Sequence, residues 1–95
     1  MLAYFIANQL EITNPEGMDE YRKHVVANIE AAGGKFLVRG GVGEKLEGDA
    51  APNRIVMIEF ENMAALKSWY DGEGYAALKQ LRMDSSRSDI FCVEG

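Results

Sequence analysis

Residues 54–61 read Arg54-Ile55-Val56-Met57-Ile58-Glu59-Phe60-Glu61, and this stretch decides the fold. Branched and aromatic residues in so short a run predict a β-strand. The apolar residues occupy both odd and even positions, and a strand that is apolar on both sides is usually covered on both faces. The sequence therefore predicts a sheet whose two faces are both covered.

A second strand and a turn precede this stretch. Residues 35–39 form a short strand pattern with Phe36 and Val38 on one side. The glycines at positions 40, 41 and 43 indicate a bulge or a close backbone approach at the end of that strand. Residues 48–53 have the composition of a turn, so the two strands are expected to form a hairpin.

Two helical pieces follow the hairpin. Asn62 is a suitable cap for a helix over residues 63–71. The glycines within residues 72–74 end this helix, and a further helical piece is expected from Tyr75 to about Met83. The second helical region of the chain is therefore broken in the middle.

The two ends of the chain each predict one more strand. Residues 2–12 and 89–93 are rich in branched and aromatic side chains. The polar residues 84–88 predict a loop before the last strand. We expect Cys92, in that strand, to be a buried packing thiol.

A helix follows the first strand. Asn14 is a capping residue and Pro15 suits the first turn. Apolar residues then recur every three or four positions, which is the pattern of a helix with one buried side. They are Met18, Tyr21, Val25, Ile29 and Ala32. Gly33-Gly34 ends the helix.

This order of elements predicts a single α+β domain over residues 1–95. It is the order of a ferredoxin-like βαββαβ sandwich, with a four-stranded antiparallel sheet and its helices on one face. A chain of 95 residues has nothing left to cover the other face, and it buries only roughly 60–65% of its surface on folding. We therefore expect a homodimer formed through the open face of the sheet.

The charge of the chain excludes several partners. Fifteen acidic residues against ten basic ones give a net charge of −5, which argues against nucleic acid and anionic membranes as partners. Glu47 and Arg54 are expected to form a surface ion pair, and residues 19–23 a solvated helix face. No apolar run is long enough to span a bilayer and the start lacks a basic leader region, so a cytoplasmic location is expected.

No cofactor or metal is expected. A single histidine and a single cysteine do not make a zinc site, which needs three or four such ligands. The glycines lack the spacing of a phosphate-binding or dinucleotide-binding loop, and no hydrolase nucleophile motif is present.

Three residues are candidates for proton transfer and anion binding. His24 is either a general base or haem ligand at a pocket rim, or an exposed residue on the helix flank. Arg39 and Glu59 lie on neighbouring strands, where they either bind and deprotonate an organic acid or satisfy each other as an ion pair. The sequence leaves both alternatives open.

Four further residues are candidates for substrate binding. Trp69, Tyr70 and Tyr75 cluster around the break between the helical pieces, either as a ligand-binding wall or as core packing. Arg82 shares a helical face with Tyr75 and binds an anion if that face points inward. If the face points outward, Arg82 is a solvated charge.

The run from Gly33 to Gly41, together with Trp69-Tyr70, Arg82 and the closing Val93-Glu94-Gly95, resembles a bacterial family catalogued as domain of unknown function 1330. The resemblance covers essentially the whole chain. It implies the dimeric α+β barrel class, which includes cofactor-independent monooxygenases, muconolactone isomerases, haem-degrading enzymes and chlorite-dismutase-like proteins. It implies no settled reaction.

Two main hypotheses of function follow. The first is a cofactor-independent enzyme of the oxygenase or isomerase type that acts on a small organic acid or phenol, with Glu59 or His24 as base and Arg39 or Arg82 stabilising the anion. The second is a non-catalytic ligand-binding or stress-related dimeric module. A purely structural dimer is the third. The sequence does not decide whether the protein is an enzyme.

Overall fold

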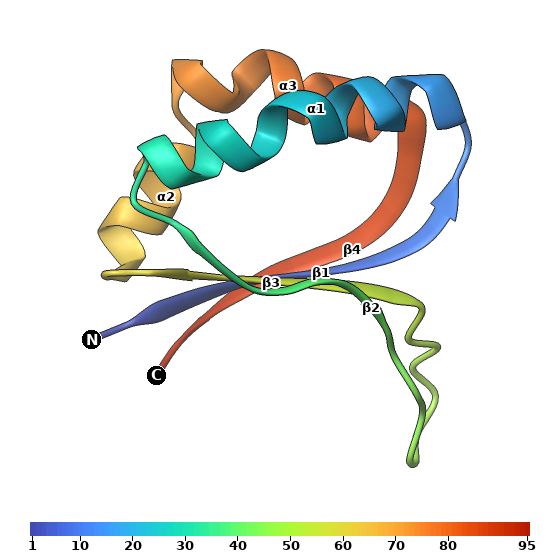
Figure 1. The fold of residues 1–95 in the computed structure, drawn as a ribbon. Helices are drawn as coiled ribbons and strands as arrows, with labels where there is room; N and C mark the ends of the chain where they lie inside the picture. The colour runs from blue at the N-terminus through green and yellow to red at the C-terminus, as the bar shows by residue number, and fades with distance from the viewer.

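Four strands and three helices follow one another in the expected order in a computed structural model that describes residues 1–95 (Figure 1). They are β1 (Ala3–Ile12), α1 (Pro15–Ala31), β2 (Lys35–Val42), β3 (Arg54–Phe60), α2 (Met63–Tyr70), α3 (Glu73–Ser85) and β4 (Ser86–Glu94). The strands lie in the order β2-β3-β1-β4, and every neighbouring pair is antiparallel. The predicted ferredoxin-like α+β fold is confirmed.

Local sequence signals fix both ends of α1. The side chain of Asn14 accepts a hydrogen bond from the backbone N–H of Gly17 at 3.2 Å, and Pro15 occupies the first turn. Gly33 has φ +87°, a conformation that glycine adopts at little cost, and the N–H of Gly34 then closes onto the carbonyl of Ile29 at 2.9 Å. The glycine pair therefore ends the helix as expected.

The prediction of a loop over residues 84–88 is wrong. α3 runs to Ser85, and β4 begins at the next residue. The carbonyl of Ser85 accepts hydrogen bonds from the backbone of Thr13 and Asn14, and the hydroxyl of Ser86 donates to the carbonyl of Arg82 at 2.8 Å. The Ser85 carbonyl and the Ser86 hydroxyl thus find partners inside the fold, and helix and strand join without a loop.

All three helices lie on one face of the sheet (Figure 1). Alternate residues of β1 point toward them, because side chains alternate between the faces of a strand. These residues, Ala3, Phe5, Ala7 and Gln9, are buried. Ala3, Phe5 and Ala7 pack with the apolar side of α1, with β3 and with Trp69 and Tyr75 in a single core. None of the three helices is long and apolar enough to cross a membrane.

The other face of the sheet has no cover within the chain (Figure 1). Ile6 of β1 pairs with Met57 of β3 on one side and with Phe91 of β4 on the other. Phe91 is 57% exposed, and Val93 beside it is also exposed. The apolar character expected on both sides of the strands is present, but only one side is covered.

The prediction of a buried Cys92 is wrong, because this thiol is exposed. β4 pairs only with β1 and forms one edge of the sheet. A residue near the end of an edge strand has neighbours on one side only, which leaves the cysteine open to solvent.

Candidate functional site

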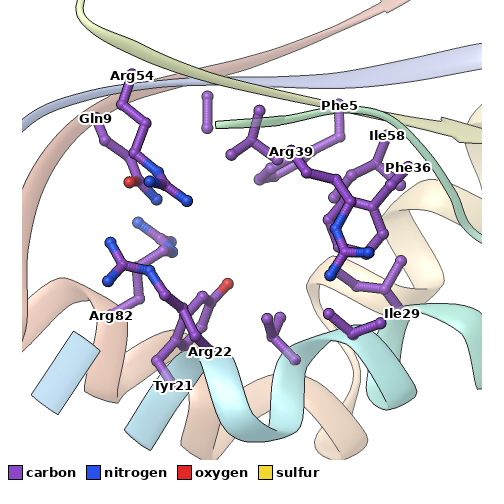
Figure 2. Close-up of a pocket in the computed structure, with 14 residues that line it drawn as sticks. Phe5, Gln9, Tyr21, Arg22, Ile29, Phe36, Arg39, Arg54, Ile58 and Arg82 are labelled. Carbon is purple, nitrogen blue, oxygen red and sulfur yellow. The ribbon is translucent and has the colours of Figure 1, made fainter. Parts of the chain in front are cut away.

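A cavity of about 150 Å³ lies between α1 and the helix-facing side of the sheet (Figure 2). Most of its wall is apolar, since strand alternation and the three-to-four spacing along α1 turn these side chains inward. The apolar residues are Phe5, Ala7, Val25, Val26, Ile29, Phe36, Val56 and Ile58. The cavity therefore offers an apolar surface to a small ligand.

Four of the five arginines of the chain line this same cavity. They come from four different elements, namely Arg22 from α1, Arg39 from β2, Arg54 from β3 and Arg82 from α3. No aspartate or glutamate lines the cavity. Only Arg22 has a carboxylate nearby, at 3.6 Å from the exposed Asp19. The cavity carries an excess of positive charge in a protein that is negative overall.

Arg82 is the most buried of the four, with 6% of its surface exposed. Its Nε donates a hydrogen bond to the hydroxyl of Tyr75 at 3.3 Å, whereas its Nη2 is buried and has no partner. Burial lowers the pKa of Arg82, but the hydrogen bond with Tyr75 and the nearby phenol oxygens raise it by more. The guanidinium therefore stays charged, and it has a donor to spare.

Tyr75 connects Arg82 to Tyr21, whose hydroxyl lies 2.6 Å from that of Tyr75. Tyr75 is 1% exposed and already accepts from Arg82, and no other acceptor for its own proton is present. We therefore assign Tyr75 as the donor to Tyr21, which leaves the Tyr21 proton free on the cavity side. Burial raises the pKa of Tyr21, so this group is a neutral donor at ordinary pH.

Gln9 and Arg54 are cross-strand neighbours on β1 and β3 and share the helix-facing side. The amide oxygen of Gln9 and the Nε of Arg54 are buried without a hydrogen-bond partner. Buried polar groups are usually paired, so this cluster calls for a partner that the chain itself does not supply. Figure 2 shows both residues at the same end of the cavity as Arg82.

Among the residues expected to bind substrate, Arg39 and Arg82 line the cavity. Tyr75 does not line the cavity, but its hydroxyl accepts the hydrogen bond of Arg82. Trp69 is a core residue that packs on Tyr75 at 4.2 Å between ring centres and donates its indole N–H to Asn28 at 2.8 Å. Tyr70 lies away from this cavity, at a second hollow of about 340 Å³ between α2 and β4.

The two residues expected to act as bases do not reach the cavity. The side chain of His24 is 59% exposed, and its Nε2 lies 3.0 Å from a carboxylate oxygen of Glu20 on the helix surface. Glu59 lies opposite Tyr4 and Lys35 on the uncovered face of the sheet. The catalytic roles of His24 and Glu59 stay predictions that the cavity does not support.

The expected contact between Arg39 and Glu59 is wrong. Arg39 pairs with Val56, whose side chain faces the helices, whereas Glu59 lies on the other face. Glu59 lies three positions after Val56 on β3, and alternate residues of a strand point to opposite sides, so the two side chains lie on different faces. The two charges are therefore kept apart by the sheet itself.

The sequence predicts no site role for four polar residues of the cavity, namely Gln9, Tyr21, Arg22 and Arg54. The expected surface pair of Glu47 with Arg54 is not formed, and Arg22 faces the cavity as well as solvent. Strand alternation contained the missing signal, since Arg54 shares the parity of Val56 and Ile58. No group of three histidine, cysteine or acidic side chains is arranged to hold a metal ion.

The comparisons with known proteins agree with this architecture. The model of a family described as "Domain of unknown function (DUF1330)" matches residues 2–95. No curated protein matches the sequence. A protein of unknown function from Rhodopseudomonas palustris has a similar solved structure, with a TM-score of 0.75, 16% identity, and coverage of 99% of this chain and 82% of that one.

Two other solved structures match this chain over nearly the whole length of both proteins. SnoaB, a cofactor-independent oxygenase from Streptomyces nogalater, has a TM-score of 0.70 at 13% identity, with 99% of this chain and 92% of that one covered. A dimeric ferredoxin-like protein of unknown function from Jannaschia sp. CCS1 has a TM-score of 0.67 at 16% identity, with both chains fully covered. At such low identity the likeness concerns the fold.

Proposed function

This chain belongs to the family described as a domain of unknown function (DUF1330), and from its cavity we propose that it binds a small organic anion, a carboxylate or phenolate, between α1 and the sheet. The observation that carries the proposal is the cluster of arginines without carboxylates. Guanidinium groups pair strongly with carboxylates and other oxyanions. An apolar pocket with a few convergent polar groups is the usual form of a small-molecule site.

The size of the cavity limits the ligand. Engineered protein cavities of about this volume hold one benzene molecule. The apolar wall and the arginines together suit a single ring or a short carbon chain that ends in an acidic group. Tyr21 would donate its hydrogen bond to the same acidic group as Arg82.

The unit that we propose is a homodimer joined through the uncovered face of the sheet. A solved protein of the same fold is described as dimeric, which supports two copies. The uncovered face carries a stripe of apolar side chains from three strands, namely Ile6, Met57, Phe91 and Val93. Such a stripe is typical of a protein interface.

A cofactor-independent enzyme of the oxygenase or isomerase type is the second candidate. It is favoured by the Tyr21–Tyr75–Arg82 chain, which brings a neutral proton donor and a fixed positive charge to one wall of the cavity. Such a wall lowers the free energy of an enolate or phenolate. The non-catalytic alternative is favoured by the lining of the cavity, which holds no carboxylate or imidazole to act as base.

Benzoate binding tests the proposal. We expect benzoate to bind to the wild-type protein by isothermal titration calorimetry, and the Arg54→Gln variant to bind about tenfold more weakly or worse. The matched control is Arg87→Gln, which removes the same charge from an exposed arginine paired with Glu11. Failure of the wild-type protein to bind benzoate, or equal weakening in both variants, would contradict the proposal.

Ionisation of bound 4-nitrophenol tests the second candidate. Neighbouring cations favour the anion, so the pKa of the bound phenol should fall below that of the free phenol. The absorbance of the phenolate, followed against pH with and without protein, measures the difference. An unchanged pKa for the bound phenol would remove the support for the enzyme and leave the binding proposal in place.

A further inference from the structure

The positive charges of the cavity are separated into two groups. Figure 2 shows Arg54 and Arg82 with Arg22 on one side of the cavity, and Arg39 across from them beside Phe36. Arg82, which is almost fully buried, and the half-buried Arg54 mark the deep end, whereas Arg22 also reaches solvent. Arg39 is exposed and its guanidinium lies 5.1 Å from the centre of the Phe36 ring, so it belongs to the mouth.

Apart from Arg22, which lies 3.6 Å from Asp19, the arginines of both groups lack a negative partner. At the deep end, Nη2 of Arg82 and Nε of Arg54 are buried without acceptors. Arg39 has no carboxylate within ion-pair distance, and its contact with Phe36 leaves its hydrogen-bond donors free. A ligand with one acidic group would satisfy one end and leave the other unpaired.

Between the two groups the wall is apolar. Phe5, Val25, Val56 and Ile58 line the cavity and present no hydrogen-bonding side-chain atoms. A ligand that bridges the ends therefore needs a carbon chain or a ring in its middle and an acidic group at each end. This arrangement specifies both the charge and the shape of the ligand.

From this arrangement we propose that the preferred ligand is a short dicarboxylate, a refinement that rests on the proposed function. Its inner carboxylate binds Arg54 and Arg82 and accepts the hydrogen bond of Tyr21. Its outer carboxylate binds Arg39 at the mouth, where solvent reaches it. The unpaired N–H donors of Arg54 and Arg82 favour an ionised inner carboxylate. The exposed Arg39 favours ligands that carry a second, outer carboxylate.

Adipate and hexanoate test the refinement, because the two acids have the same number of carbons and differ in one carboxylate. We expect adipate to bind the wild-type protein on the order of tenfold more tightly than hexanoate by calorimetry. In Arg39→Gln the advantage of adipate should disappear while hexanoate binds as before. Arg87→Gln, with its charge removed away from the cavity, should keep the full advantage.

The outcomes separate this refinement from the broader proposal. Equal binding of the two acids to the wild-type protein, or an adipate advantage that survives in Arg39→Gln, would overturn the dicarboxylate and leave anion binding intact. If neither acid nor benzoate binds, the proposed function itself fails. Circular dichroism of Arg39→Gln checks its fold, and removal of this exposed side chain is expected to leave the spectrum unchanged.

Discussion

Arg82 keeps its charge inside the fold with neutral partners. Its hydrogen bond goes to the phenol of Tyr75, and Tyr75 in turn binds Tyr21. A carboxylate in place of either tyrosine would neutralise the guanidinium and occupy it. Because phenols hold the side chain in place without neutralising it, the positive charge stays available to a ligand.

Tyr21 should make the stability of the protein sensitive to alkaline pH. Burial raises its pKa in the folded state, whereas in the unfolded chain it ionises at about 10. Its contribution is therefore fully present below pH 10 and is lost as the pH rises further, by up to about 1.4 kcal/mol per pH unit. Urea unfolding between pH 8 and pH 11, at roughly half-unit steps, measures this loss.

The stability of the Tyr21→Phe variant should fall less steeply over the same pH range. At neutral pH its free energy of unfolding should be about 1 kcal/mol lower than that of the wild-type protein, because one hydrogen bond is lost. Tyr4→Phe is the control, since Tyr4 lies on the opposite face of the sheet and Tyr21 is left unchanged. An alkaline slope that is the same in Tyr21→Phe as in Tyr4→Phe would show that Tyr21 is not the group responsible.

Among the elements, β2 has an irregular register against β3 at the residues that line the cavity. Its register against β3 shifts twice, between Phe36 and Val38 and again between Arg39 and Gly41. At the second shift Gly40 has φ +94°. The guanidinium of Arg54 occupies the space where any other residue at position 40 would place its Cβ. The bulge therefore provides room for an arginine of the cavity, and only glycine fits both the backbone and the space.

Alanine at Gly40 should damage both stability and binding. We expect Gly40→Ala to lower the free energy of unfolding by about 1–2 kcal/mol for its backbone conformation, and to weaken benzoate binding because its Cβ displaces Arg54. Gly48→Ala is the matched control, since Gly48 has φ +93° and no atom within 4 Å of an added Cβ. Chemical denaturation and calorimetry measure the two effects.

A similar loss of stability in the two variants, with weaker binding in Gly40→Ala alone, is the expected result. Equal benzoate affinity in both variants would show that the bulge does not position Arg54.

The spacing of apolar residues makes the helices and strands predictable from the sequence. The residues of the cavity are less predictable. The apolar spacing of α1, the cap at Asn14 and the glycines after the helix are local signals, and the structure confirms them. The cavity joins Arg22, Arg54 and Arg82 from three elements, and their contact depends on the tertiary packing of α1 and α3 over the sheet. Alternation along β3 would have turned Arg54 inward, but charged side chains are rarely buried, which favoured the surface pair.

The whole molecule has one face covered by helices and one that is not (Figure 1). A single chain of this size leaves Phe91 and Val93 in contact with water at one side of the sheet. Contact with a second copy would bury these side chains and gain hydrophobic stabilisation. Stability and assembly are then linked, since a dimer is stabilised by its own concentration.

Phe91→Asp should separate the two copies. We expect the wild-type protein to sediment as a dimer at micromolar concentration, and Phe91→Asp to sediment as a monomer, because a carboxylate in the apolar stripe opposes burial. Met83→Asp introduces the same charge at an exposed apolar residue of α3, away from the uncovered face, and should remain dimeric. Monomeric wild-type protein would exclude the interface.

The concentration of arginine in the cavity leaves six basic residues against fifteen acidic ones over the rest of the molecule. An approaching anion is therefore repelled by the exterior before it is attracted by the interior. Added salt screens the long-range repulsion first, as the Debye length falls from about 30 Å to about 10 Å. The association rate constant for an acid should accordingly rise with ionic strength in stopped-flow mixing, and polyanions such as nucleic acids would be turned away before they reach the arginines.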